Sequence, residues 1–419
     1  MAGHASAQDL AAVGIGSSLW MPLFLFFWGI LSAQQPIISG YKGANKLRRI
    51  MPTVWQGLYI AVAAAVIMIV LLTNVHPVLT RLKLEPATAG IAQGYLDAFA
   101  WGIPALLLMT ALRGLTDGLG HTRVIMVFSL ISTLFNLPLN YLFIYGGFGI
   151  PAMGGVGCGW ATSLSNGIAA IGLLVYLNRS RVYQNFRLLA YVARPNPRVL
   201  HYVLRLGLPI GFTIFVEASM FSVIALFLAP LGPVVVAGHQ IALNVVSLLF
   251  MLPLSLGMAI TLRVSFLVGA GAPESARLLS RSSIILASAI SLVFAIVLFA
   301  FRAPIAALYS SDPEVQAVSV TLLMYAALFQ VADVIQVTCI SGLRGYKDTR
   351  IPMIIMLFSF WVVGMPLGYT LAFTSLLVPA MGAAGFWVGL TGGLISASVL
   401  MGWRLFGYNW GWARPKASA

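Results

Sequence analysis

The chain is poor in charged residues, and above all in acids. Only 8% of its 419 residues are charged and only ten are Asp or Glu, whereas 60% are apolar. A single soluble core could not hide so much apolar surface. Inside lipid, only helices and closed barrels satisfy their backbone groups. Barrel strands would give short alternating segments, but the apolar runs here last about 20–30 residues. The composition therefore predicts an all-α polytopic membrane protein.

Cysteine is also scarce. Cys158 and Cys339 are the only two cysteines, and both lie in or beside apolar runs. This pattern implies neither a disulfide framework nor a metal cluster, so we expect two free thiols. The sequence also shows no nucleotide-binding loop, catalytic triad or metal-ligand spacing. We therefore expect no enzyme activity, no resident cofactor and no ATP-driven transport.

Eleven apolar runs are long enough to span a membrane. They cover roughly 11–37, 53–75, 88–112, 122–145, 156–178, 204–230, 235–262, 280–301, 316–342, 351–373 and 382–405. Of the 24 Lys and Arg residues, 21 fall in alternate loops, and only Arg81, Lys83 and Arg302 fall in the others. The positive-inside rule places the 21 in the cytoplasm. The net charge of +14 therefore reflects topology, and we expect a bacterial plasma-membrane protein with a cytoplasmic C-terminus and no nucleic-acid partner.

Several short motifs occur twice in the chain. Pro138-Leu139-x-Tyr141 returns 228 residues later as Pro366-Leu367-x-Tyr369. Gly43-Ala44 returns at the same offset, and Leu-Arg-Gly occurs at 112–114 and 343–345. Internal duplication is typical of secondary transporters. We therefore expect two pseudo-symmetric bundles at 1–180 and 204–408, a cytoplasmic linker at 181–203 and a cytoplasmic tail at 409–419.

The repeat and the charge pattern both predict a twelfth span before Met1. The run at 204–230 has no partner 228 residues earlier, and an odd number of spans leaves the two termini on opposite sides of the membrane. The expectation is eleven visible spans of twelve. A start assigned too late and a genuine truncation both remain open, and we favour the first.

Three of the ten acids lie inside apolar runs. Glu217 and Asp333 lie roughly 20 and 15 Å from the cytoplasmic ends of their runs, and Asp97 about 14 Å from an outer end, by the helical rise. A carboxylate near the midplane costs on the order of 3 kcal/mol. Two such acids in one half favour a shared ion or proton site, although a structural hydrogen bond by a protonated acid is the alternative. Asp97 fits a structural or a functional role equally well. For the other seven acids we expect solvated faces or helix caps: Asp9, Glu85, Asp117, Glu274, Asp312, Glu314 and Asp348.

Several amides complete the candidate pathway. Asn136 and Asn140 are four residues apart and share a helix face, where they could coordinate a cation or only bond neighbouring helices. Gln240 and Asn244 begin the seventh run near its outer end, and Gln336 follows Asp333 by one turn. His239, beside Gln240, is expected to lie at the membrane interface or to form hydrogen bonds rather than to act as a ligand.

Three segments together resemble the multidrug and toxic compound extrusion (MATE) family, in its NorM-like branch. They are Gly238-His239-Gln240-Ile241-Ala242-Leu243-Asn244, Gly342-Leu343-Arg344-Gly345-Tyr346-Lys347-Asp348-Thr349 and Gly154-Gly155-Val156-Gly157-Cys158-Gly159. The resemblance implies two six-helix bundles around a V-shaped cavity and cation-coupled export of cationic, often aromatic drugs.

The resemblance also assigns roles to particular residues. Glu217 and Asp333 match carboxylates of the C-terminal bundle implicated in Na⁺ or H⁺ coupling. Asn136 and Asn140 match polar positions grouped with an acid on the family's first helix, which would lie upstream of Met1. No metal other than Na⁺ at Glu217 and Asp333 is implied.

These observations predict a monomeric secondary multidrug antiporter that exchanges small cationic compounds for Na⁺ or H⁺ by alternating access within the lipid bilayer. A lipid-linked precursor flippase is one alternative, and it would require a cationic cavity. A transport-inactive truncated membrane protein is the other.

Overall fold

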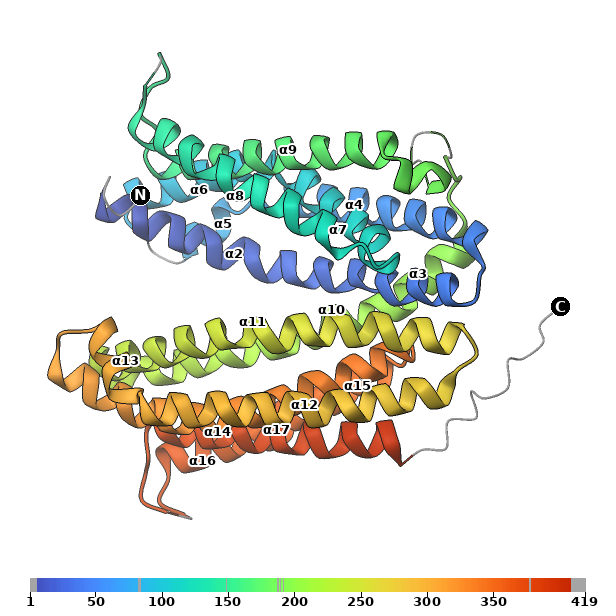
Figure 1. Ribbon diagram of the computed structural model, residues 1–419. Helices are drawn as coiled ribbons and strands as arrows, with labels where there is room; N and C mark the ends of the chain where they lie inside the picture. The colour runs from blue at the N-terminus through green and yellow to red at the C-terminus, as the bar shows by residue number, and fades with distance from the viewer. Residues whose placement is uncertain are drawn as a thin grey trace. The chain divides into compact units, whose positions relative to one another are not determined.

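The computed structural model describes residues 6–81, 84–147, 149–186, 188, 190, 192–376 and 378–407. The predicted tail at 409–419 lies outside this range. The described chain folds into two compact units, which we call the N-terminal unit (Met1–Gly211) and the C-terminal unit (Phe212–Ala419). Both are helical (Figure 1), and no strand is present among the described residues, so the predicted all-α fold class is confirmed.

Ten elements lie wholly before residue 190 in the described chain: α2 (Ala7–Ser32), α3 (Gln34–Gly43), η1 (Leu47–Arg49), α4 (Ile50–Thr73), α5 (His76–Arg81), α6 (Pro86–Ala100), α7 (Ile103–Gly118), α8 (Thr122–Tyr145), α9 (Gly155–Arg179) and η2 (Arg181–Phe186). The later elements are α10 (Pro197–Leu228), η3 (Ala229–Leu231), α11 (Pro233–Gly269), α12 (Pro273–Ala300), α13 (Arg302–Tyr309), α14 (Pro313–Gly345), α15 (Arg350–Leu357), the π-helix η4 (Phe358–Gly364), α16 (Met365–Phe373) and α17 (Ala383–Phe406). The boundary between the two units falls within α10.

The eleven predicted spans correspond to ten long apolar helices and one bent pair in the described chain. Several helices are longer than their predicted runs. The start of α10 is an example, because it begins at Pro197 inside the predicted linker. Asn196 caps this helix, since its Oδ1 accepts a hydrogen bond of 3.0 Å from the Arg198 amide. Asn-Pro at 196–197 is a helix-start signal, since proline is favoured at the first helical position.

The third predicted span, 88–112, is present as a bent pair of helices. It consists of α6 and α7, which meet at an angle of 47°. Gly102 lies at the break, where a Cβ atom would come within 2.6 Å of the Ser163 Cα. The Ser163 hydroxyl donates to the carbonyls of Ala98 and Phe99 at 2.8 and 3.3 Å. A neighbouring helix thus satisfies carbonyls at the break, which is how a broken helix is tolerated in lipid.

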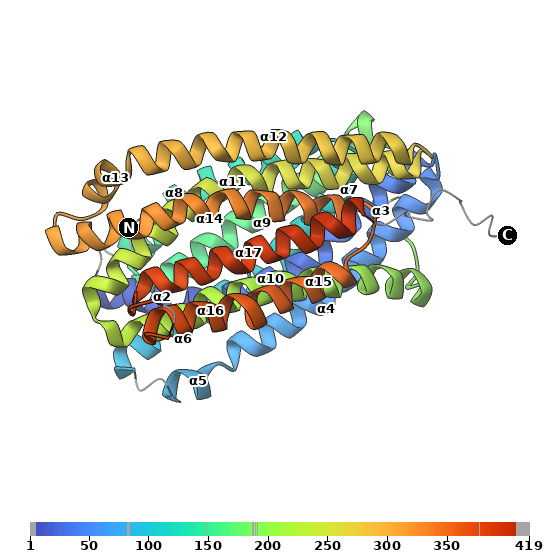
Figure 2. The ribbon, with the colours of Figure 1, turned by 90° about the horizontal axis from the view of Figure 1, so that it is seen from below.

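The core of the C-terminal unit is built around α14. This helix lies between α11 and α12 on one side and α17 on the other (Figure 2). Trp387 of α17 is fully buried; its ring packs edge-on against Phe329 of α14, and its Nε1 donates to His239 Nδ1 at 3.2 Å. The expectation that His239 forms hydrogen bonds is therefore confirmed.

Ion pairs lie near one end of the helices in both units. Arg113 bonds Asp117 at 3.0 Å in the N-terminal unit, and Arg404 bonds Asp348 at 3.0 Å in the C-terminal unit. Asp117 was expected to be solvated or to cap a helix, and that expectation is wrong. It is buried, and it also accepts a hydrogen bond from Gln35. Burial of this carboxylate is tolerated because it has two partners.

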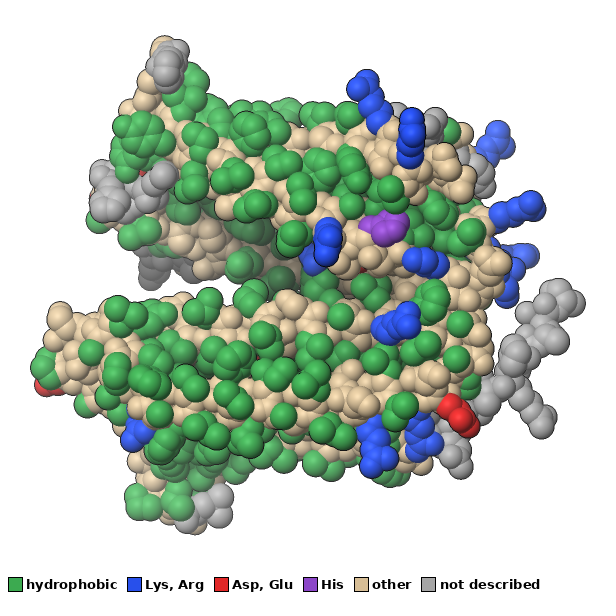
Figure 3. Space-filling model, in the orientation of Figure 1, with side chains coloured by type: hydrophobic (Ala, Val, Ile, Leu, Met, Phe, Trp, Pro, Cys, Tyr) green, Lys and Arg blue, Asp and Glu red, His purple; other side chains and the backbone are tan. Residues whose placement is uncertain are grey.

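The distribution of surface charge agrees with a membrane orientation. In each unit, the visible Lys and Arg side chains gather mainly at one end of the helices, and hydrophobic side chains cover the middle (Figure 3). This is the pattern that the loop-by-loop charge count predicts. Both cysteines are free thiols, as expected.

Candidate functional site

The C-terminal unit places Asp333 in the middle of its central helix. Its side chain is only 2% exposed. Gln330 and Gln336, one turn away on either side, are also buried. The three polar side chains are spaced as i, i+3 and i+6 and form one stripe on α14. This stripe is the first candidate site.

Several polar atoms of this stripe have no hydrogen-bond partner. They are Asp333 Oδ2, Gln336 Oε1 and both side-chain polar atoms of Gln330. Gln336 Nε2 contacts the sulfur of Met356 at 3.1 Å. A buried polar atom without a partner costs roughly 1–3 kcal/mol, so four such atoms within two turns need a reason. Three of the four are oxygens that can accept a hydrogen bond or coordinate a cation, and the one from Asp333 can also take up a proton.

Glu217 approaches this stripe from α10. Glu217 lies one turn before Phe221 on α10, and Asp333 lies one turn after Phe329 on α14. Phe221 of α10 packs edge-on against Phe329 of α14, with ring centroids 6.3 Å apart, which brings the two helices together. The structure therefore places the two predicted carboxylates on neighbouring helices of the C-terminal unit, with Gln336 one turn beyond Asp333.

The second cluster lies in the N-terminal unit, between α8 and α9. Asn140 Nδ2 donates to Asn136 Oδ1 at 2.7 Å, and Asn136 Nδ2 donates to Ser165 at 3.3 Å and to Thr162 at 3.5 Å. The two predicted amides therefore share one hydrogen-bond network. Both side chains are half-buried, so the network faces the surface of its unit.

The internal repeat suggests that these amides are not needed for packing. At the 228-residue offset, Asn136 and Asn140 correspond to Gly364 and Gly368. In the C-terminal unit these glycines pack directly against Gly389 of α17. The same position of the fold is thus filled by close backbone contact in one unit and by polar side chains in the other. A polar cluster that the scaffold does not require is a candidate for function.

Three predicted pathway residues lie outside both clusters. Asp97 is exposed on α6, where it accepts a hydrogen bond of 2.8 Å from Gln93, one turn before Trp101. Gln240 and Asn244 are exposed on α11. The described residues contain no group of three or more His, Cys, Asp or Glu side chains that could hold a metal ion.

Two buried glutamines whose side-chain nitrogen and oxygen both have no partner were not predicted. Gln330 belongs to the first cluster, and its signal was a long polar side chain inside an apolar run, one turn before an acid. Gln34 is fully buried on α3 and wedged between Gly57 and Gly114, and both its side-chain polar atoms have no partner. Nothing in the sequence marks Gln34, because it lies beside Gln35 near the end of an apolar run.

Comparison with known proteins identifies the family. The sequence matches the MatE family model over residues 1–142 and 209–370. The chain belongs to the MATE family. It is 44% identical over 405 residues to the probable multidrug resistance protein NorM of Shewanella oneidensis, covering 97% of this chain and 88% of that protein. It is 42% identical over 418 residues to the multidrug resistance protein MdtK of Yersinia enterocolitica, covering 100% of this chain and 91% of that protein. The predicted NorM-like branch is thereby confirmed.

Solved structures support the same fold. The crystal structure of the eukaryotic MATE transporter AtDTX14 matches with a TM-score of 0.87 at 21% identity, covering 99% of this chain and 91% of that one. An outward-facing multidrug resistance MATE transporter of the MOP superfamily matches with a TM-score of 0.86 at 18% identity, covering 96% and 89%. At these identities the likeness concerns the fold.

Proposed function

We propose that this MATE protein is a secondary multidrug efflux antiporter that exports cationic, often aromatic compounds in exchange for Na⁺ or H⁺. One observation carries the proposal: a buried carboxyl group, Asp333, lies among polar atoms that have no partner, on a helix that packs against the helix of Glu217. The names of the NorM and MdtK relatives, which are multidrug resistance proteins, support the substrate class.

In this mechanism, Asp333 and Glu217 hold the coupling ion. A proton would neutralise one carboxyl group, whereas Na⁺ would also recruit the oxygens of Gln330 and Gln336, since hard cations prefer oxygen ligands. Either ion relieves the repulsion between the two acids. A cationic substrate would relieve the same repulsion, so ion and drug compete. Rocking of the two repeats then provides alternating access.

We further propose that the protein is a monomer of the bacterial inner membrane with a cytoplasmic C-terminus and with 181–203 as the cytoplasmic linker between the bundles. The positive charge at alternate loops supports this orientation. A flippase for lipid-linked precursors would need cationic groups in the middle of the helices. Asp333 and Glu217, which lie there, are acidic, and Arg344 lies at the end of α14, so the flippase alternative is not favoured.

Transport in vesicles tests the proposal. Purified protein in proteoliposomes should expel a cationic dye when an inward Na⁺ or H⁺ gradient is imposed. Gradients of the two ions, imposed separately, identify the coupling ion. Efflux that continues after both gradients are collapsed would contradict an antiport mechanism.

Replacement of Glu217 by Gln should reduce ion-driven efflux by about tenfold, which equals about 1.4 kcal/mol. The amide has the same shape but cannot be protonated to the acid or supply a charge. Dye efflux rates at saturating gradient measure the effect. Glu314→Gln is the matched control, because Glu314 lies in the first turn of α14, far along the helix from Asp333. Equal rates in the two variants would show that Glu217 is structural.

The asparagine pair should affect transport without affecting folding. The double variant Asn136→Ala, Asn140→Ala removes the amide network but no apolar contact of the core, so we expect a several-fold loss of efflux and an unchanged melting temperature. Asn74→Ala is the control, since Asn74 is exposed and bonds only its own helix and the adjacent Thr73. A melting temperature that falls together with transport would indicate a structural role instead.

A further inference from the structure

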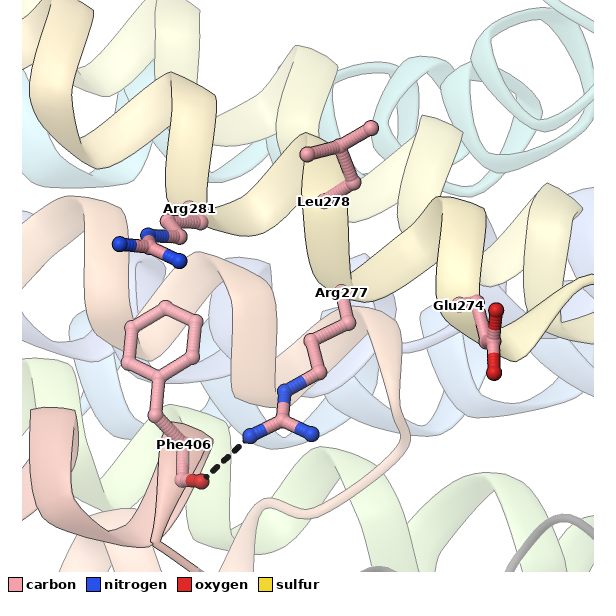
Figure 4. Close-up of a pocket in the computed structure, with 5 residues that line it drawn as sticks. All are labelled: Glu274, Arg277, Leu278, Arg281 and Phe406. Atoms are coloured by element: carbon pink, nitrogen blue, oxygen red, sulfur yellow. Dashed lines mark hydrogen bonds between the residues drawn. The ribbon is translucent and has the colours of Figure 1, made fainter.

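A groove lies at the end of the C-terminal unit where Lys and Arg are concentrated. It is a cavity of about 580 Å³ between the first turns of α12 and the last turn of α17 (Figure 4). The lining residues are Glu274, Arg277, Leu278, Arg281 and Phe406. It belongs to neither of the clusters described above.

The charged residues of this groove lie along one face of α12 in a fixed order. Glu274, Arg277 and Arg281 are spaced as i, i+3 and i+7, which is one helix face. By the helical rise, Arg277 lies about 4.5 Å and Arg281 about 10.5 Å beyond Glu274 along the axis. Figure 4 shows the three side chains in this order. A negative group is therefore followed by two positive groups.

The opposite charges of the groove do not neutralise each other. Arg277 donates to the carbonyl oxygen of Phe406 at 2.9 Å, which holds its guanidinium at the end of α17. Among the described residues, Glu274 and Arg281 form no hydrogen bond and no ion pair. A fixed arginine and two charged groups without partners leave room for a ligand that carries both signs of charge.

The position of the groove in the membrane determines which of these charged residues lies nearest to the hydrocarbon. The apolar stretch of α12 begins after Arg281, so Arg281 is nearest to the hydrocarbon and Glu274 is farthest from it. Trp403, one turn before Phe406 on α17, is 72% exposed, as expected for an aromatic side chain at a membrane interface. Phospholipid headgroups lie at this depth, with the phosphate closer to the hydrocarbon than the terminal group.

We propose that this groove binds the headgroup of a phospholipid that carries a primary ammonium group, of the phosphatidylethanolamine class. Arg281 and Arg277 bind the phosphate, and Glu274 accepts hydrogen bonds from the ammonium group. Arginine alone would favour an anionic lipid. Glu274 disfavours an anionic lipid and is complementary to an ammonium group. The distance between the ammonium and phosphate groups of this lipid is comparable with the three-residue spacing of Glu274 and Arg277.

Lipid binding to the full chain tests this site independently of transport. Native mass spectrometry of the detergent-purified protein would measure binding of phosphatidylethanolamine, phosphatidylcholine and phosphatidylglycerol. We expect phosphatidylethanolamine to bind about tenfold more tightly than the other two, which equals about 1.4 kcal/mol. The choline headgroup has no N–H donor for Glu274, and the glycerol headgroup has no positive charge.

Two variants and one control separate the parts of the proposal. Arg281→Gln should weaken all three lipids, whereas Glu274→Gln should abolish the preference for phosphatidylethanolamine over phosphatidylglycerol. Arg350→Gln, at an exposed arginine on α15, should change neither. Melting temperatures confirm that each variant folds. Equal binding of the three lipids, an unchanged preference in Glu274→Gln, or displacement of the lipid by inorganic phosphate would overturn the proposal.

Discussion

The Asp333→Asn variant is expected to insert and fold normally but to lose ion-driven efflux almost completely. An amide has nearly the same shape as the carboxyl group and costs less to bury than a charge. It cannot carry a transferable proton or a negative charge. Because Asp333 is the most buried acid of the first cluster, we expect a fall of about 100-fold in the efflux rate, which equals about 2.7 kcal/mol. Dye efflux in proteoliposomes measures it.

The matched control for this variant lies on the same helix. Asp312 caps α14 by accepting a hydrogen bond of 2.9 Å from the Glu314 amide. Asparagine caps helices about as well as aspartate, so Asp312→Asn should retain efflux and stability. Normal ion-driven efflux in Asp333→Asn would show that this carboxyl group has no part in coupling. If transport is lost together with the yield of folded protein, the Asp333 carboxyl group stabilises the core instead of coupling ions to transport.

The membrane fold could be predicted well because the features that indicate it can be read along the chain, without knowledge of tertiary contacts. Apolar runs as long as 204–230 and alternation of basic loops report directly on crossing of a bilayer. Asp333 and Glu217 could be recognised for the same reason, since an acid inside an apolar run is conspicuous. Their proximity to each other could be expected only from their similar depth, and the packing of Phe221 on Phe329 supplies the contact.

Features that depend on a neighbouring helix were missed. The break at Gly102 requires Ser163 of α9 to satisfy the exposed carbonyls, and no local pattern shows that partner. Asp117 resembles an acid at a helix end, yet it is buried and accepts a hydrogen bond from Gln35, which lies 82 residues away in the chain. The π-helix at Phe358–Gly364 packs against α17, where Ser359 donates a hydrogen bond to Ser396, and the sequence did not indicate this contact either. All three features involve residues that are distant in the chain, which is why the sequence did not reveal them.

The glycine contact between α16 and α17 leads to the last prediction, that Gly389→Ala prevents stable folding. A Cβ atom at Gly389 would lie 2.5 Å from the Gly368 nitrogen and 2.6 Å from the Gly364 oxygen. Both are backbone atoms, so no side-chain rotation can relieve the clash, and the helices must separate. Overpacking commonly costs about 1–3 kcal/mol when side chains can adjust, and the cost here should exceed that range.

The same helix provides the control for this prediction. Gly402 of α17 has no atom within 4 Å of the position of a new Cβ, and alanine favours a helix by up to about 1 kcal/mol over glycine. Gly402→Ala should therefore fold with an equal or higher melting temperature. Fluorescence size-exclusion chromatography and thermal melts of the two variants in detergent measure the difference. If both variants elute as the same sharp peak and melt together, close backbone contact at Gly389 does not hold α16 and α17. In that case, the presence of Gly368 in one unit where the other has Asn140 would not reflect a need for glycine in packing.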